Sequence, residues 1–200
     1  TSGLRILVIP KQRSVSYAML TVRFGAQDVC FREEDAASSK WQQLPDGIAH
    51  FMEHQMFTLA DGRDVSELFS AIGADVNAWT SCDKTSYLFQ TTEHEREALE
   101  ILLRFVLSAT FTDAGIQKEQ GIIAEEIRGD DDNPWERVYQ LSMRAMYQEH
   151  PIRQKICGTE ASIATITKDM LSLCHRLFYR PDNMYLVFCG TMSPEEVVDR

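Results

Sequence analysis

The run from Asp46 to Phe57 constrains this chain more than any other segment, because it spaces its polar side chains as a helix does. His50, Glu53 and His54 follow one another at intervals of three and one residues, which places all three on one side of an α-helix. Two imidazoles one turn apart can bind a single divalent metal ion, and the carboxylate between them can take a proton from a water on that ion. The spacing therefore predicts a helix, capped by Asp46, that carries a hydrolytic metal site.

The simpler interpretation of this segment is an ordinary amphipathic helix with a polar face. Its core side would then consist of Ile48, Ala49, Phe51, Met52 and Met56. That interpretation gives no reason for two of the five histidines and a glutamate to share one stripe. Chance alone produces the His-x-x-Glu-His pattern in about one such sequence in a hundred. The metal site is therefore the stronger hypothesis.

A third metal ligand is expected from a second helix, predicted between Ile116 and Arg128. Glu119 and Glu126 are separated by two helical turns, so they lie almost one above the other, whereas Glu125 points about 100° away. For this helix alone, a solvated glutamate-rich face is the more common explanation. The second helix is therefore interpreted as a source of metal ligands only in combination with the first.

Together, the His-x-x-Glu-His motif and the two later glutamates resemble the inverted zincin signature of the pitrilysin/insulinase metallopeptidases. Other stretches resemble the same family: Leu-Pro-Asp-Gly-Ile-Ala-His at the motif, Gly-Ala-Asp-Val-Asn-Ala-Trp-Thr from Gly73, Thr-Ser-Tyr from Thr85, and Glu-Ile-Arg and Asp-Asn-Pro further on. The resemblance runs from Gly3 to the last residue and is strongest to compact bacterial members.

The resemblance implies a zinc-dependent endopeptidase that hydrolyses peptide bonds in peptides or small unfolded proteins. His50, His54 and Glu126 would hold the zinc ion, with Glu53 as the general base that takes a proton from water and returns it to the leaving amine. Glu119 is a second candidate catalytic residue, which would orient a ligand or hold charge beside the metal.

The resemblance also implies a substrate-binding strand beside the metal. An extended peptide would add to this edge strand through main-chain hydrogen bonds, so binding would depend on shape more than on sequence. The expected strand residues are Asn77, Ala78, Trp79 and Thr80.

Family members usually contain a second, homologous half. Residues 1–200 are therefore expected to form a single domain, the N-terminal, metal-binding half of a longer enzyme, and a length of 200 residues with 44% hydrophobic content suits one core. Its expected partners are a peptide substrate and the second half or a partner subunit. The isolated chain is expected to bind zinc but cleave poorly, and to expose apolar surface near Phe57, Trp79 or Trp135.

Composition argues against other classes of partner. A net charge of −10 disfavours nucleic acids and anionic membrane surfaces, which need clustered Lys and Arg. No apolar run approaches the roughly 18 residues of a membrane span, and the first residues lack a secretion-signal pattern. Five scattered cysteines without a Cys-x-x-Cys pair indicate reduced thiols, so a cytoplasmic location is expected.

The order of elements predicts an α+β domain. Strand patterns at Leu4–Pro10, Tyr17–Phe24, 76–81, 86–91 and 184–189 are interrupted by helical patterns without regular alternation. Such an order favours helices packed on one face of a mixed or antiparallel sheet, the metallopeptidase half-domain that the resemblance implies.

Three consecutive aspartates, Asp130 to Asp132, precede Asn133 and Pro134. They could bind a cation, but a hinge between two helices is the stronger interpretation, because Asn133 can cap the next helix and Pro134 suits its first position.

Two other classes of function stay open. The chain could be a catalytically silent subunit that uses a peptidase fold as a scaffold, since a fold does not fix a function. It could instead be a peptide-binding module with a structural metal, although such sites prefer four protein ligands and usually Cys. A cleavage assay separates the alternatives, because a catalyst cleaves the peptide and a module only retains it.

Overall fold

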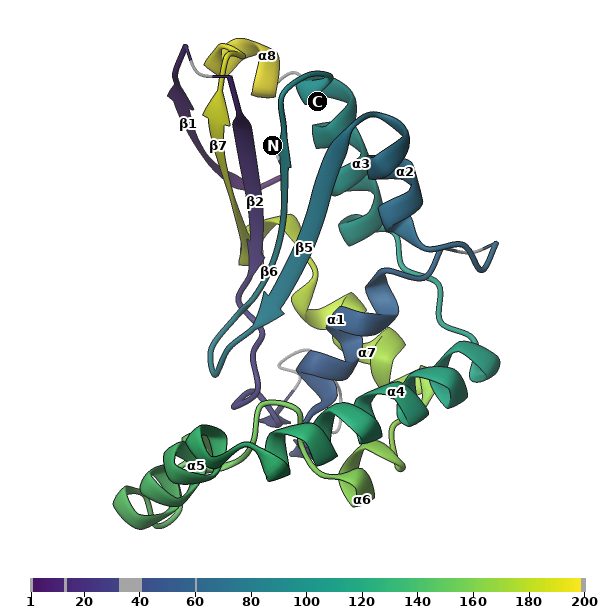
Figure 1. Cartoon of the computed structure of the whole chain (residues 1–200), viewed down its shortest axis with the longest axis vertical. Helices are drawn as coiled ribbons and strands as arrows, with labels where there is room; N and C mark the ends of the chain where they lie inside the picture. The colour runs from purple at the N-terminus through teal and green to yellow at the C-terminus, as the bar shows by residue number, and fades with distance from the viewer. Residues whose placement is uncertain (1, 13, 33–40, 60, 199–200) are drawn as a thin grey trace.

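The computed structural model describes residues 2–12, 14–32, 41–59 and 61–198 of the chain. Figure 1 shows a sheet in the upper part of the molecule and a group of helices beneath it. The lower helices are α4 (Asp113–Asp132), α5 (Pro134–Met146) and α6 (Glu160–Ile163), while α1 (Ile48–Met56) and α7 (Lys168–Phe178) lie between them and the sheet.

The main sheet has five strands in the order β1-β7-β2-β6-β5. β1 runs parallel to β7, and the other neighbouring strands are antiparallel, so the sheet is mixed and β5 forms one free edge. Its strands are β1 (Arg5–Pro10), β2 (Ser16–Val22), β5 (Ala74–Thr80), β6 (Thr85–Thr91) and β7 (Met184–Gly190).

A second, two-stranded sheet joins β3 (Cys30–Phe31) to β4 (Gln42–Gln43), and the intervening residues 33–40 lie outside the described part of the chain.

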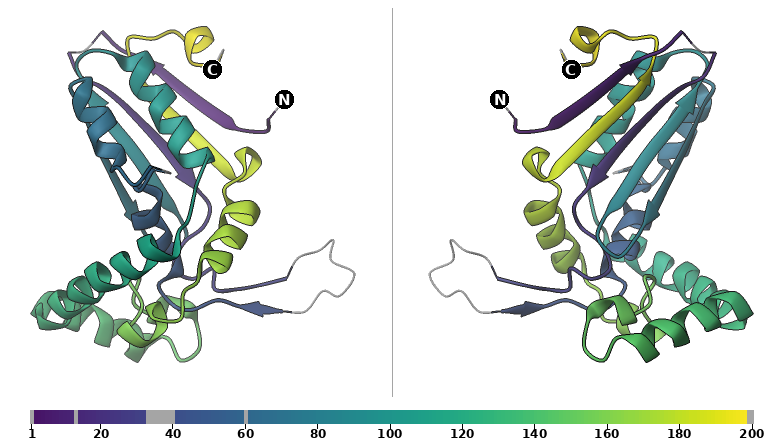
Figure 2. Two further views of the ribbon diagram at one scale, coloured as in Figure 1. Left: turned by 90° about the vertical axis from the view of Figure 1, so that its right-hand side faces the viewer. Right: turned by 90° about the vertical axis from the view of Figure 1, so that its left-hand side faces the viewer.

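Helices cover one face of the main sheet, as predicted. Alternate residues of the central strands are buried on that face, for example Leu20 in β2, Tyr87 in β6 and Phe188 in β7. α2 (Val65–Ala71) packs on β5, α3 (Glu95–Leu107) on β6 and β2, and α8 (Pro194–Val198) on β1. The two views of Figure 2 show α2 and α3 on the same side of the sheet. The α+β fold class is confirmed.

The predicted cap of the metal-site helix is wrong, because Gly47 and not Asp46 is the N-cap of α1, and no side chain caps it. Gly47 has φ of 89°, and a Cβ there would lie 2.5 Å from the Cys157 carbonyl oxygen. A Cβ on Gly158, with φ of 75°, would lie 2.4 Å from the Asp46 carbonyl oxygen. Two glycines thus let the backbones touch, and this contact fixes the start of α1.

The helical pattern from Ile116 to Arg128 lies within α4, which continues beyond Arg128 to Asp132. Thr112 caps it by accepting a hydrogen bond from the Gly115 N–H at 3.0 Å. The three aspartates form its last turn, so the expected hinge is confined to Asn133. Acidic groups oppose the helix dipole there, and an ion pair between Asp131 and Lys155 offsets part of that cost.

The predicted cap of α5 is confirmed, since the Asn133 side chain accepts a hydrogen bond from the Trp135 N–H at 3.0 Å and Pro134 is the first helical residue.

α5 buries none of its residues, although it is strongly amphipathic. Trp135 is 82% exposed and Leu141 is 60% exposed, and the helix projects at the lower left of Figure 1. Trp79 is also exposed, whereas Phe57 packs its ring 5.8 Å from that of Phe105. The apolar surface expected around the site is therefore concentrated on α5 and β5.

All five cysteines lie in the described residues and are free. None of the described helices has the length and apolar character needed to cross a membrane.

Candidate metal centre

α1 holds the two histidines of the motif next to each other. Their ring centroids are 4.6 Å apart and the ring planes are inclined at 64°. The helix keeps this position because its opposite side is anchored in the core through Phe51 and Met52, which are fully buried. The side chain of His50 is 12% exposed and that of His54 is 26% exposed, so both rings are largely shielded from water.

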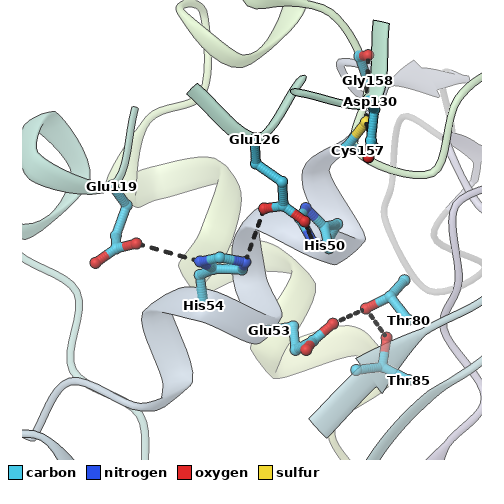
Figure 3. A network of polar contacts seen from close by, with 10 residues as sticks. All are labelled: His50, Glu53, His54, Thr80, Thr85, Glu119, Glu126, Asp130, Cys157 and Gly158. Carbon is cyan, nitrogen blue, oxygen red and sulfur yellow. Dashed lines mark hydrogen bonds and ion pairs between the residues drawn. The ribbon is translucent and has the colours of Figure 1, made fainter. Parts of the chain in front are cut away.

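Glu126 reaches the same point from α4, which packs against α1. Its Oε1 lies 3.5 Å from His50 Nε2 and its Oε2 lies 3.5 Å from His54 Nε2. One donor atom from each of the three residues falls within 4.8 Å of the others. Figure 3 shows the two rings and the carboxylate turned toward one another. The structure therefore brings together the three residues predicted as ligands.

Glu119, one further glutamate of α4, contacts the other side of a histidine ring. Its Oε2 is 3.3 Å from His54 Nδ1, and its side chain is buried. A carboxylate at this nitrogen fixes the ring orientation and leaves Nε2 free for a metal. Glu125, in contrast, is exposed and pairs with Arg128 at 2.6 Å. The helical spacing thus distinguished the inward glutamates from the outward one.

The two histidines differ in their electrostatics. Burial, together with the neighbouring His54, lowers the pKa of His50 to about 4, so His50 is neutral near pH 7. For His54, burial alone would lower the pKa, but the hydrogen bond to Glu119 and the nearby charge of Glu126 raise it overall. His50 Nδ1 is buried and has no hydrogen-bond partner in the described part of the chain.

Glu53 lies on the third side of this cluster and is 9% exposed. Its Oε2 accepts a hydrogen bond from the Thr80 hydroxyl at 2.5 Å. Burial raises the pKa of Glu53, and the Thr80 hydrogen bond and the His54 charge offset part of that rise. A carboxylate with a raised pKa is a stronger proton acceptor, which is what a general base needs.

Two cavities flank the site along the free edge of the sheet. One of about 540 Å³ extends toward α5, and one of about 360 Å³ extends toward the segment that precedes α2 and contains Phe57 and Asp64. Glu53, His54 and Ala78 line both. Trp79 and Thr80 line the larger cavity and Asn77 the smaller one, so the predicted substrate strand runs past the site from one cavity to the other.

One edge donor of this strand is already occupied, since the Ala78 N–H donates to Asn77 Oδ1 at 2.8 Å. A peptide that pairs with β5 at this residue has to replace that hydrogen bond. Substrate binding by Asn77 to Thr80 stays a prediction.

The Thr80 side chain was not predicted from the sequence, where Thr80 was expected only as part of a strand that binds through its main chain. Strand alternation carries the signal, because Thr80 has the same parity as the buried Ala74 and therefore faces the helices. The contribution of α5 was not predicted either; its Arg137 and Arg144 line the larger cavity.

The donor set suits zinc. Two imidazole nitrogens and one carboxylate oxygen are a common catalytic zinc set, which leaves a coordination position for water. His50 is neutral and so already in the form that binds metal. These residues therefore fit the ion that the sequence resemblance implies.

Comparison with known proteins identifies the family. Residues 39–160 match the family model described as "Insulinase (Peptidase family M16)". The chain belongs to the insulinase family. Its similarity to the "Uncharacterized zinc protease YmfH" of Bacillus subtilis (strain 168) is 42% identity over 201 residues, covering all of this chain and 46% of that protein. "Uncharacterized zinc protease YmxG" of the same organism is 32% identical over 157 residues, covering 76% of this chain and 38% of that protein.

Solved structures agree with this assignment to the insulinase family. An M16-like peptidase from Alicyclobacillus acidocaldarius has a TM-score of 0.93 and 41% identity, over 100% of this chain and 46% of that one. An inactive M16 peptidase domain from Pseudomonas fluorescens, at 18% identity and a TM-score of 0.81, shares the fold, over 98% of this chain and 46% of that one. The chain spans about half the length of the curated relatives it matches.

Proposed function

We propose that this chain is the metal-binding half of a zinc-dependent endopeptidase that hydrolyses peptide bonds in peptides or small unfolded proteins. The convergence of His50, His54 and Glu126 beside the buried carboxylate of Glu53 carries this proposal. The names of the relatives as zinc proteases support it.

A zinc ion bound by His50, His54 and Glu126 would supply a Lewis acid that lowers the pKa of water to about 7. Glu53 accepts a proton from the attacking water and then returns it to the leaving amine, a task favoured by its raised pKa. Glu119 holds the His54 ring through Nδ1 so that Nε2 faces Glu126.

The substrate in this proposal is an extended peptide paired with β5. β5 is an edge strand, so its outer N–H and C=O groups can pair with another chain once the peptide replaces the bond from the Ala78 N–H to Asn77 Oδ1. The two cavities on either side of Glu53 then receive side chains from both sides of the bond that is cut. Main-chain pairing selects for an extended shape, which unfolded segments supply.

The complete enzyme in this proposal includes a second homologous half or a partner subunit. The relatives are about twice as long as this chain, and α5 leaves its apolar residues exposed next to the larger cavity. A second half would supply donors to the developing oxyanion, and losing one such donor costs about a hundredfold to a thousandfold in rate. The chain alone is therefore expected to cleave slowly.

A silent subunit is the alternative function. The inactive Pseudomonas domain shares this fold, so the fold by itself does not establish catalysis. The three clustered ligand candidates and the buried Glu53 argue against a silent subunit, because a scaffold does not need them.

The experiment follows cleavage of a quenched fluorescent peptide library by the zinc-loaded chain, alone and mixed with a separately made second half. Glu53→Gln should keep zinc and lose cleavage by about a hundredfold or more, whereas Glu125→Gln, at an exposed position of α4, should behave as wild type. Zinc binding without any cleavage, even after mixing, would favour the silent subunit.

A further inference from the structure

The Thr80 hydroxyl holds the carboxylate of Glu53 from the sheet side. The 2.5 Å bond from Oγ1 to Oε2 joins the end of β5 to α1 and is drawn in Figure 3. Within the described residues it is the one hydroxyl group hydrogen-bonded to that carboxylate. A hydroxyl that donates to a carboxylate makes a strong, directional bond, and burial of Glu53 strengthens it further.

The position of this hydroxyl is fixed by the sheet. Thr80 pairs with Thr85 across the β5-β6 hairpin, with their hydroxyl oxygens 3.3 Å apart. The Thr85 hydroxyl in turn donates to the Phe24 carbonyl oxygen at 2.9 Å.

The chain that follows Thr80 is held as well. Beyond Thr80, the Ser81 N–H donates to the Lys84 carbonyl at 2.8 Å, and the Ala26 N–H donates to the Ser81 carbonyl at 2.9 Å. Gly25 allows this close contact, since a Cβ there would lie 2.4 Å from the Lys84 amide nitrogen. Ser81, which follows the end of β5, is therefore bonded to both Lys84 and Ala26, and these bonds fix the backbone that carries the Thr80 hydroxyl.

We propose that Thr80 is a positioning residue for the general base: its hydroxyl fixes the Glu53 carboxylate in the orientation from which it takes the proton. This inference rests on the proposed function of Glu53. Without the hydroxyl, the glutamate side chain is free to rotate toward the flanking cavities, which it lines. A misplacement of about 1 Å in a catalytic group can cost roughly a hundredfold in rate.

This role differs from the one that the sequence suggests for the same residue. A strand residue that binds a peptide only through its main chain tolerates replacement of its side chain, so kcat stays near that of the wild type. Replacement of a positioning side chain instead lowers kcat, while KM and zinc affinity stay as they were.

The test compares Thr80→Val, which replaces the hydroxyl by a methyl group, with Thr80→Ser, which keeps the hydroxyl. Thr80→Val should lower kcat by roughly tenfold to a hundredfold with KM and zinc binding unchanged, and Thr80→Ser should restore most of kcat. Thr21→Val is the matched control, because it removes another buried hydroxyl of the sheet, which contacts Ser86 at 2.9 Å and not Glu53. Thr80→Ala replaces the valine variant if that one does not fold.

Crystal structures of the zinc-loaded variants provide a readout that does not need turnover. The Glu53 carboxylate should shift or adopt several orientations in Thr80→Val and return to its place in Thr80→Ser. Wild-type kcat in Thr80→Val, or an unmoved carboxylate, would overturn the inference. Absence of cleavage by the wild type would instead count against the proposed function, and the crystal structures would still decide the positioning role.

Discussion

The three glutamates of α4 should differ sharply in their effect on zinc affinity. Glu126 contacts both histidine Nε2 atoms at 3.5 Å, Glu119 contacts only the far side of His54, and Glu125 pairs with Arg128 on the surface. Replacing each in turn by glutamine removes one negative charge and keeps the size of the side chain. The charge of the chain changes equally in all three variants, so any difference arises from position.

The expected magnitudes follow from these positions. Four-ligand structural sites bind zinc with about 10 to 16 kcal/mol, which is roughly 3 kcal/mol per ligand. Since 1.4 kcal/mol corresponds to a factor of ten, Glu126→Gln should weaken binding by about a hundredfold. Glu119→Gln removes the partner of a ligand and should cost about tenfold to a hundredfold, and Glu125→Gln should cost nothing measurable.

The assay is competition for zinc with a chromogenic chelator at pH 7, on variants that first show wild-type unfolding curves. Equal losses in Glu126→Gln and Glu125→Gln would refute the ligand assignment. A larger loss in Glu119→Gln than in Glu126→Gln would exchange the roles of the two inward glutamates.

Three further predictions concern stability, each measured by urea unfolding of the metal-free chain. Phe51→Ala should cost about 3 to 5 kcal/mol, because Phe51 is fully buried beneath the site. Gly121→Ala should add about 0.5 to 1 kcal/mol, because this helical glycine is exposed and a Cβ there meets nothing within 4 Å. Lowering the pH from 7 to 5 should reduce the free energy of unfolding by about 2 kcal/mol through His50, because burial lowers its pKa to about 4 and the unfolded chain therefore takes up the proton first. The loss should be smaller in His50→Gln.

Periodicity and the family resemblance together predicted the core of the site. The spacing of His50, Glu53 and His54 predicted a helix, and the two-turn spacing of Glu119 and Glu126 placed both on one face of a second helix. The resemblance then assigned that face to the metal. The spacings are local geometric relations, so a sequence contains them in full. The fold class followed in the same way from the order of strand and helix patterns.

Contacts between segments that are distant in the sequence could not be predicted from local spacing. The start of α1 depends on the backbone of Gly158, and the last turn of α4 depends on Lys155 beside Asp131. The Thr80 side chain gains its partner only because α1 packs on β5. The roles of the site residues, the single-domain assignment and the cytoplasmic location stay predictions.

The most direct test of the metal centre is anomalous scattering at the zinc edge from a crystal of the chain soaked in zinc. The account predicts one strong peak between His50, His54 and Glu126, which disappears in His54→Ala. A peak at the aspartates of Asp130 to Asp132 or at Cys157, with none at the three predicted ligands under saturating zinc, would contradict it.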